Sequence, residues 1–116
     1  MRCRKGERPV TSDLAPELIV SDQWENGAAT VAVRGEIDFG TVGVFSARLA
    51  DVVGRIPEQL VIDLTGVSFL DSSGLHAFVR VRKDLPEHCP VILRAPQHHV
   101  RQVFEITGLS PVFTFE

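Results

Sequence analysis

The sequence predicts a single α/β domain with a mixed, mostly parallel five-stranded sheet, an N-terminal antiparallel hairpin and crossover helices. Three observations favour this class. Short apolar runs rich in β-branched residues alternate with segments whose apolar residues recur at helical spacing, which is typical of right-handed crossovers in an open sheet. An Asn-Gly pair, the strongest short hairpin signal, separates the first two runs. The length of 116 residues supports one core and is too short for two.

The hairpin is expected to begin the fold. A first strand is predicted at 17–21 and a second at 28–34, where apolar and more polar residues alternate. Asn26 and Gly27 lie between them, so the two strands should pair antiparallel. We expect Trp24, beside this turn, to cover the edge of the hairpin.

Strands and helices alternate after the hairpin. Residues 60–64, LVIDL, form an apolar run with β-branched residues, which predicts a central parallel strand covered on both faces. Thr65 and Gly66 should end this strand. Helices are predicted at 41–54, 72–85 and 97–107, and two further strands at 91–93 and 112–115.

Composition and charge narrow the class of protein. No apolar run approaches the length of about 20 residues that a membrane span needs, and the N-terminus lacks the apolar core of a signal peptide. We therefore expect a cytoplasmic protein with no membrane contact.

The first ten residues carry a net charge of +3, so the other 106 must carry −6 to give the net charge of −3. An acidic body argues against a nucleic-acid partner, and residues 1–16 are expected to be a basic, flexible leader to a domain at 17–116.

The cysteines and histidines do not predict a metal or cofactor site. Cys3 and Cys89 are far apart in the sequence and do not form a disulfide framework. His88 beside Cys89, and the adjacent pair His98 and His99, lack the four-ligand spacing of a zinc site. We therefore expect these side chains to be exposed polar positions, and we expect no bound cofactor.

A candidate site lies where the 60–64 strand leads into the next helix. Asp71, Ser72, Ser73 and Gly74 stand at that helix start, and aspartate and serine are preferred N-cap residues. One interpretation is that they only cap the helix. The other follows from position, because open α/β sheets present their sites at the carboxyl ends of their strands. A phosphate there would meet the positive end of the helix dipole and several free amide donors.

The pattern around these residues resembles a known family. A strand ending in Ile-Asp-Leu, a short turn, an aromatic residue and then Leu-Asp-Ser-Ser-Gly-Leu at 70–75 is similar to the phosphorylation segment of the anti-sigma factor antagonists, bacterial members of the STAS domain family. Gly-Glu-Ile-Asp at 35–38 matches the family's motif at the end of its second strand. VRQVFEITGL at 100–109 resembles its third helix, so the resemblance extends from about residue 18 to 115.

The resemblance implies a function and its site residues. The family's phosphoacceptor is the first serine after the aspartate, which is Ser72 here. Unphosphorylated members bind an anti-sigma factor that is also a serine kinase and so free a sigma factor; phosphorylation ends this association, and a serine phosphatase restores it. The switch loop would comprise the residues around Ser72 and on the neighbouring loop, namely Asp38, Asp71, Ser73, Gly74 and His76. Asp38 could set what the kinase recognises, cap the helix near Thr41, or do both.

Two other classes of function compete with this one. An enzyme with a Ser72, His76 and Asp38 triad is disfavoured, since the sequence lacks the Gly-x-Ser-x-Gly elbow and His76 follows on the same helix. A scaffold or ligand-sensing STAS domain outside a sigma cascade remains an alternative, because the fold does not fix the partner. Phe39, Gly40 and Gly43 depart from the family's more polar, helix-forming pattern, which predicts a late or less regular start of the first helix.

Overall fold

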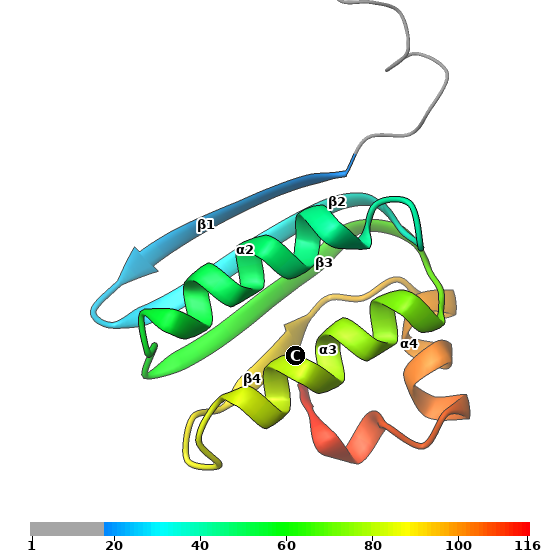
Figure 1. Cartoon of the computed structure of the whole chain (residues 1–116). Helices are drawn as coiled ribbons and strands as arrows, with labels where there is room; N and C mark the ends of the chain where they lie inside the picture. Colours follow the sequence, from blue (N-terminus) through cyan, green and yellow to red (C-terminus); the bar gives the residue numbers. More distant parts are fainter. Residues whose placement is uncertain (1–17) are drawn as a thin grey trace, which may run out of the picture.

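The computed structural model describes residues 18–116, and the leader predicted at 1–16 lies outside this range. Five strands form one sheet in the order β1-β2-β3-β4-β5. β1 pairs antiparallel with β2, and all other neighbouring strands are parallel, so the predicted mixed sheet is confirmed. The elements follow one another as shown in Figure 1: β1 (Ile19–Glu25), β2 (Ala28–Ile37), α2 (Val42–Gly54), β3 (Gln59–Leu70), α3 (Ser72–Asp84), β4 (Val91–Arg94), α4 (His98–Ile106), a 3₁₀ turn (Ser110–Val112) and β5 (Thr114–Phe115).

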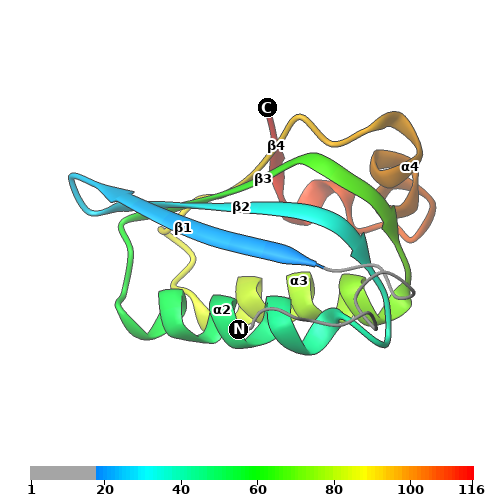
Figure 2. The ribbon, with the colours of Figure 1, turned by 90° about the horizontal axis from the view of Figure 1, so that it is seen from above.

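Two of the helices, α2 and α3, form a pair, and α4 lies outside that pair. α2 and α3 lie side by side and form a layer against one face of the sheet, whereas α4 lies outside this layer, beside the second half of β3 (Figure 2). Each of the crossovers from β2 to β3 and from β3 to β4 therefore runs through one helix of the pair. In the described part of the chain, no helix is both long and apolar enough to cross a bilayer.

The hairpin forms through the predicted turn. Asn26 and Gly27 have φ values of +54° and +83°, the left-handed conformation that a two-residue turn between twisted strands requires. β1 lies later than expected, since Ile19–Glu25 pairs along its full length with 28–34, and Glu17 is outside the described residues. Trp24 is half-buried against the core, under the guanidinium of Arg55 at 5.2 Å from the ring centroid.

β3 is much longer than the sequence predicted. Thr65 and Gly66 do not end it, because β2 runs beside it as far as Ile37 and supplies ladder partners up to Leu70. Two register shifts in this pairing absorb the irregular stretch around Gly66. A Cβ at Gly66 would lie 3.2 Å from the carbonyl oxygen of Val33, so the absence of a side chain lets the two backbones approach.

A cluster of phenylalanine rings joins the helices in the core. Phe78 of α3 is fully buried and packs against Phe45 of α2, with ring centroids 5.1 Å apart, and edge-to-face against Phe104 of α4 at 5.3 Å. Phe113, just before β5, contacts both Phe78 and Phe104. These tilted and edge-to-face arrangements are the favoured ones for aromatic pairs. The cluster fixes α3, and hence its N-terminus, relative to the sheet.

Smaller differences concern the ends of elements. The third predicted helix loses one residue at each end as α4, and the last predicted strand is reduced to Thr114–Phe115 because a 3₁₀ turn occupies Ser110–Val112. Thr41 is the N-cap of α2, one residue before the helix begins at Val42. Helix ends commonly differ by one or two residues between such descriptions.

Candidate functional site

The site is built where the carboxyl ends of β2 and β3 meet two helix starts. Ile37 and Leu70 are ladder neighbours, and the main-chain N–H of Asp71 donates to the carbonyl oxygen of Ile37 at 3.2 Å. The Gly-Glu-Ile-Asp segment at 35–38 therefore lies beside the Asp-Ser-Ser-Gly segment at 71–74. The resemblance implied this proximity, and the parallel pairing of β2 with β3 explains it.

Asp71 is the N-cap of α3. Its extended backbone lets the carboxylate Oδ1 accept hydrogen bonds from the main-chain N–H groups of Ser73 at 2.9 Å and Gly74 at 3.2 Å. Its carbonyl oxygen accepts the first helical bond, from the N–H of Leu75. The sequence suggested several free amides for a phosphate, but two of them are already bound by Asp71. Two of the helix-start amides are therefore satisfied by Asp71.

The two serines differ in their surroundings. Ser72 is the first residue of α3 and is exposed, and within residues 18–116 its hydroxyl makes no hydrogen bond. Ser73 is half-buried and lines a groove between α2 and α3. Neither side chain caps the helix, because Asp71 does so. Ser72 is thus the hydroxyl most open to a partner at this helix start.

Gly74 places the helix start against the ends of the strands. The residue is buried, and a Cβ added there would lie 2.2 Å from Cδ1 of Leu70 and 2.8 Å from Cγ2 of Ile37. No real side chain tolerates such separations, so only glycine allows α3 to begin this close to β2 and β3. The position of Ser72 depends on this contact.

Asp38 organises the turn that leads into α2. Its Oδ1 accepts from the N–H groups of Gly40 at 2.9 Å and Thr41 at 3.0 Å, and its carbonyl oxygen accepts from the N–H of Val42 at 2.8 Å. The Thr41 hydroxyl donates to the carbonyl oxygen of Glu36 at 2.7 Å. Asp38 is therefore not the N-cap residue itself, although its carboxylate satisfies amides just ahead of the helix. Its recognition by a kinase stays a prediction.

The arrangement does not form a hydrolytic triad. His76 is exposed on α3, one turn beyond Ser72, and no hydrogen bond joins Ser72, His76 and Asp38 in the part of the chain that the structure describes. Oδ1 of Asp38 accepts from the backbone amides of Gly40 and Thr41, so this carboxylate orders its own turn. A nucleophile without a hydrogen-bonded base is not activated.

The cysteine and histidine side chains considered as metal ligands make other contacts or lie apart. Within residues 18–116, no three His, Cys, Asp or Glu side chains gather closely enough to hold an ion. Cys89 is buried rather than exposed, with its Sγ 3.4 Å from the carbonyl oxygen of Pro57, and burial raises the pKa of its thiol. His99 uses its Nε2 at 2.6 Å from the carbonyl oxygen of Ser68, which ties α4 to the end of β3. Cys3 lies outside the described residues.

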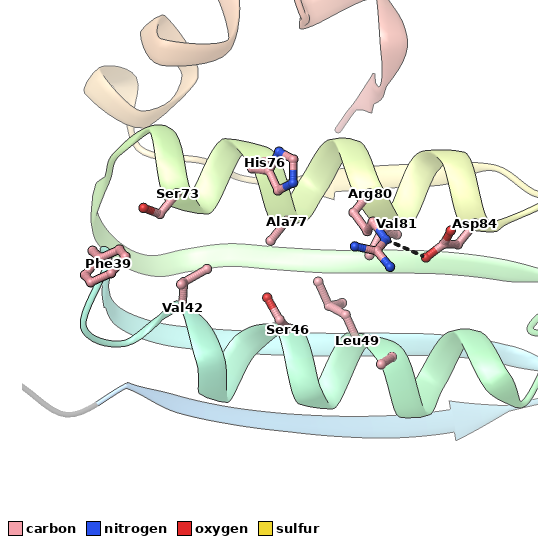
Figure 3. Close-up of a pocket in the computed structure, with 11 residues that line it drawn as sticks. Phe39, Val42, Ser46, Leu49, Ser73, His76, Ala77, Arg80, Val81 and Asp84 are labelled. Atoms are coloured by element: carbon pink, nitrogen blue, oxygen red, sulfur yellow. Dashed lines mark ion pairs between the residues drawn. The ribbon is translucent and has the colours of Figure 1, made fainter.

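The structure adds a feature that sequence reasoning missed, a groove of about 570 Å³ between α2 and α3. Figure 3 shows Val42 and Leu49 on one wall and Ala77 and Arg80 on the other. Phe39, 85% exposed, stands at the end of the groove near Ser73. The signal available in the sequence was a run of small residues at helical spacing along the two helices, Ser46, Ala50, Ser73 and Ala77.

Comparisons with known proteins define the class of protein. The model of the STAS domain family matches residues 21–116, most of the chain, so the chain belongs to the STAS domain family. It is 31% identical over 100 residues to the anti-sigma-F factor antagonist RsfB of Mycobacterium tuberculosis, covering 85% of this chain and 82% of the relative. It is 38% identical over 85 residues to the anti-sigma-B factor antagonist of Listeria monocytogenes, covering 71% and 73%.

Solved structures agree with this assignment. An anti-sigma factor antagonist from Mycobacterium paratuberculosis superposes with a TM-score of 0.75 at 31% identity, covering 85% of each chain. Unphosphorylated SpoIIAA, also an anti-sigma factor antagonist, shares the fold with a TM-score of 0.72 at 22% identity, covering 84% of this chain and 88% of SpoIIAA. The predicted membership in the anti-sigma factor antagonist branch of the STAS family is therefore confirmed.

Proposed function

We propose that this chain is an anti-sigma factor antagonist whose partner switching is controlled at Ser72. The unphosphorylated form binds an anti-sigma factor that is also a serine kinase, and so frees a sigma factor. Phosphorylation of Ser72 by that kinase ends the association, and a serine phosphatase restores it. The observation that carries the proposal is the exposed hydroxyl of Ser72 on the first residue of α3, which makes no hydrogen bond to any of residues 18–116 and lies in the segment that resembles the family's phosphorylation site.

The surroundings of Ser72 support a switch that acts at the surface. A phosphate adds about −1.5 to −2 charge at neutral pH and three acceptor oxygens. Because the Asp71 carboxylate already holds the amides of Ser73 and Gly74, the phosphate gains little by folding back onto the helix start. It therefore remains at the surface, next to the charges of Asp71 and Asp38. A partner that packs closely on this surface would have to desolvate the added charge.

The remaining parts of the proposal follow from a role in binding. We infer that the chain is not an enzyme, because within residues 18–116 no base is hydrogen-bonded to the hydroxyl of Ser72, which we assign as a phosphoacceptor. Its partners are the anti-sigma kinase and the phosphatase, and it works in the cytoplasm, where a sigma factor meets RNA polymerase. The function needs neither a metal nor a cofactor of its own.

The test is phosphorylation by the partner itself. Purified protein would be mixed with each anti-sigma kinase of its host and ATP, the phosphate mapped by mass spectrometry, and affinity measured before and after modification. We expect phosphate on Ser72, no modification of Ser72→Ala, and normal modification of the matched control Ser73→Ala. Binding should fall by about 100-fold or more, the range of a strongly disrupted interface residue. Phosphate on another residue, or unchanged affinity after modification, would contradict the switch, and failure to bind any such kinase would favour the scaffold alternative.

A further inference from the structure

We infer that the groove between α2 and α3 receives an amphipathic segment of the anti-sigma factor, with apolar side chains entering beside Phe39 and an acidic side chain reaching Arg80. This inference rests on the proposed function and adds a second, separate contact surface to it. The switch at Ser72 would then decide whether the partner can occupy a groove that starts next to it.

The groove has an apolar floor that is open to solvent. Leu49 and Ala77 are buried at its base, while Val42 and Ser46 line the α2 side (Figure 3). The volume of about 570 Å³ exists because small side chains line both helices where larger ones would have filled it. Such a shape takes side chains from an added element, as grooves that bind amphipathic helices do.

Phe39 leaves an apolar side chain exposed to solvent at one end of the groove. Its side chain is 85% exposed, the largest exposed fraction among the large hydrophobic residues described. The Asp38 carboxylate and the Thr41 hydroxyl fix the turn that carries it, so the ring is presented by an ordered turn. An exposed aromatic ring at the mouth of an apolar groove is a typical anchor of a protein interface.

Charged side chains at the rim of the groove indicate the charge of the partner segment. Arg80 borders the groove on α3, with His76 one turn before it and Lys83 one turn after it. Among residues 18–116, Arg80 pairs only with Asp84 at 3.5 Å, and both side chains are largely exposed, 72% and 48%. Exposed pairs of this kind contribute little. An acidic side chain of the partner can therefore take the place of Asp84, which also lines the groove, and bind Arg80 at small cost.

Continuity with the switch fixes the identity of the occupant. Ser73 lines the groove and follows Ser72 directly, while Phe39 follows Asp38 directly. A partner whose kinase site reaches the hydroxyl of Ser72 must lie over this end of the molecule. The groove includes Ser73 and Phe39 in its lining and offers such a partner apolar contact, so we assign the groove to the same partner.

The experiment compares substitutions inside the groove with matched ones outside it. Ala50 lines the groove and Ala47 does not, although both are exposed on α2, so Ala50→Trp fills the groove and Ala47→Trp leaves it open. Affinity for the anti-sigma factor that binds the wild-type protein would be measured by calorimetry, with circular dichroism confirming the fold. We expect Ala50→Trp to weaken binding about ten-fold or more, and Ala47→Trp to change it less than two-fold.

Two further pairs separate the apolar and the charged contact. Phe39→Ala should weaken binding about ten-fold, while Ile106→Ala, which removes a side chain that is 83% exposed on α4, should not. Arg80→Glu should weaken binding, while Arg101→Glu, which alters a similar pair with Glu105 at 3.4 Å, should not. A loss with Phe39→Ala but none with Arg80→Glu would overturn the acidic character assigned to the segment.

The outcomes distinguish this inference from the proposed function. If Ala50→Trp binds like Ala47→Trp while phosphorylation of Ser72 still abolishes binding, the groove assignment is wrong and the switch stands. If light scattering shows that Ala50→Trp only disrupts self-association, the groove is a contact between copies of this chain, and the assignment is again wrong. If the wild-type protein binds no anti-sigma factor of its host, the proposed function fails, and the groove assignment fails with it.

Discussion

The two ends of the sheet hold their carboxylates by different means. Near the hairpin, the Asp22 carboxylate accepts from the guanidinium of Arg48 at 2.5 Å and from the indole N–H of Trp24 at 2.8 Å. The guanidinium of Arg55 lies 3.8 Å from the same carboxylate. At the other end, Asp38 and Asp71 accept from backbone amides, and the ion pairs within residues 18–116 include neither of them.

We call the end of the sheet near Asp22 the structural end, and the end that carries Asp38, Asp71 and Ser72 the binding end. The negative charge of Asp22 is balanced by the guanidinium groups of Arg48 and Arg55, which tie β1 to α2. The Asp22 carboxylate is therefore not available to a partner. The charges of Asp38 and Asp71 are held by neutral donors and remain uncompensated beside the exposed Ser72 and Phe39. A phosphate added there increases an existing negative charge, whereas near Asp22 it would meet two arginines. The same residue type therefore stabilises the fold at one end and prepares a switch at the other.

The largest effect is expected at Gly74, which positions the binding end. In Gly74→Ala the new methyl would overlap Leu70 and Ile37, and relief of such overpacking costs about 1 to 3 kcal/mol in the free energy of unfolding. Gly43→Ala in the first turn of α2 is the matched control, because nothing lies within 4 Å of a Cβ there and the change should stabilise by at most about 1 kcal/mol. Urea unfolding checks both values. Equal effects of the two changes would show that α3 does not depend on this close approach.

A smaller effect is expected from the cap of α3. Asp71→Ala leaves the amides of Ser73 and Gly74 without a partner and should cost about 1 kcal/mol. Asp71→Asn removes the charge but keeps an accepting oxygen, so its free energy of unfolding should stay close to that of the wild-type protein. Measuring both variants by urea unfolding separates hydrogen bonding from charge. A loss in Asp71→Asn as large as in Asp71→Ala would mean that the charge, and not the hydrogen bonds, stabilises this end.

Local signals in the sequence predicted much of this architecture. Asn26 and Gly27 identified the hairpin because a two-residue turn needs their left-handed backbone. Asp71 and the serines after it identified the start of α3 within one residue, since capping depends on neighbours in the chain. The proximity of Asp38 to this helix start came from the family resemblance rather than from spacing. The structure places both segments at adjacent strand ends.

Features that depend on distant parts of the chain were not predicted. β3 continues past Gly66 because β2 offers ladder partners there, and the register shifts that allow this leave no local pattern. Which of Asp71, Ser72 and Ser73 caps the helix depends on side-chain rotamers, which the residue types do not determine. The groove arises from the separation of α2 and α3, so small residues such as Ala50 and Ala77 gain a role only when the two helices are side by side.

The smallest effect is expected for Asp22, whose charge the two arginines balance at the structural end of the sheet. The hydrogen bond from Arg48, followed by that from Trp24, holds the pKa of Asp22 below its ordinary value of 3.8. A carboxyl with a lowered folded-state pKa stabilises the protein above the unfolded-state value, and this contribution is lost as pH falls through the folded-state pKa. The free energy of unfolding of the wild-type protein should therefore exceed that of Asp22→Asn at neutral pH. The gap should narrow below about pH 4, with high salt reducing it as well.

Urea unfolding of the two proteins between pH 7 and about pH 2.5 measures this gap directly. Other carboxyl groups titrate in the same range, but they do so in both proteins, and the difference between the two isolates Asp22. A gap that stays constant down to the lowest pH would mean that an uncharged side chain holds Arg48 and Trp24 equally well. In that case hydrogen bonding alone, as at Asp71, would account for both ends of the sheet, and the contrast between a neutralised and an uncompensated carboxylate would not hold.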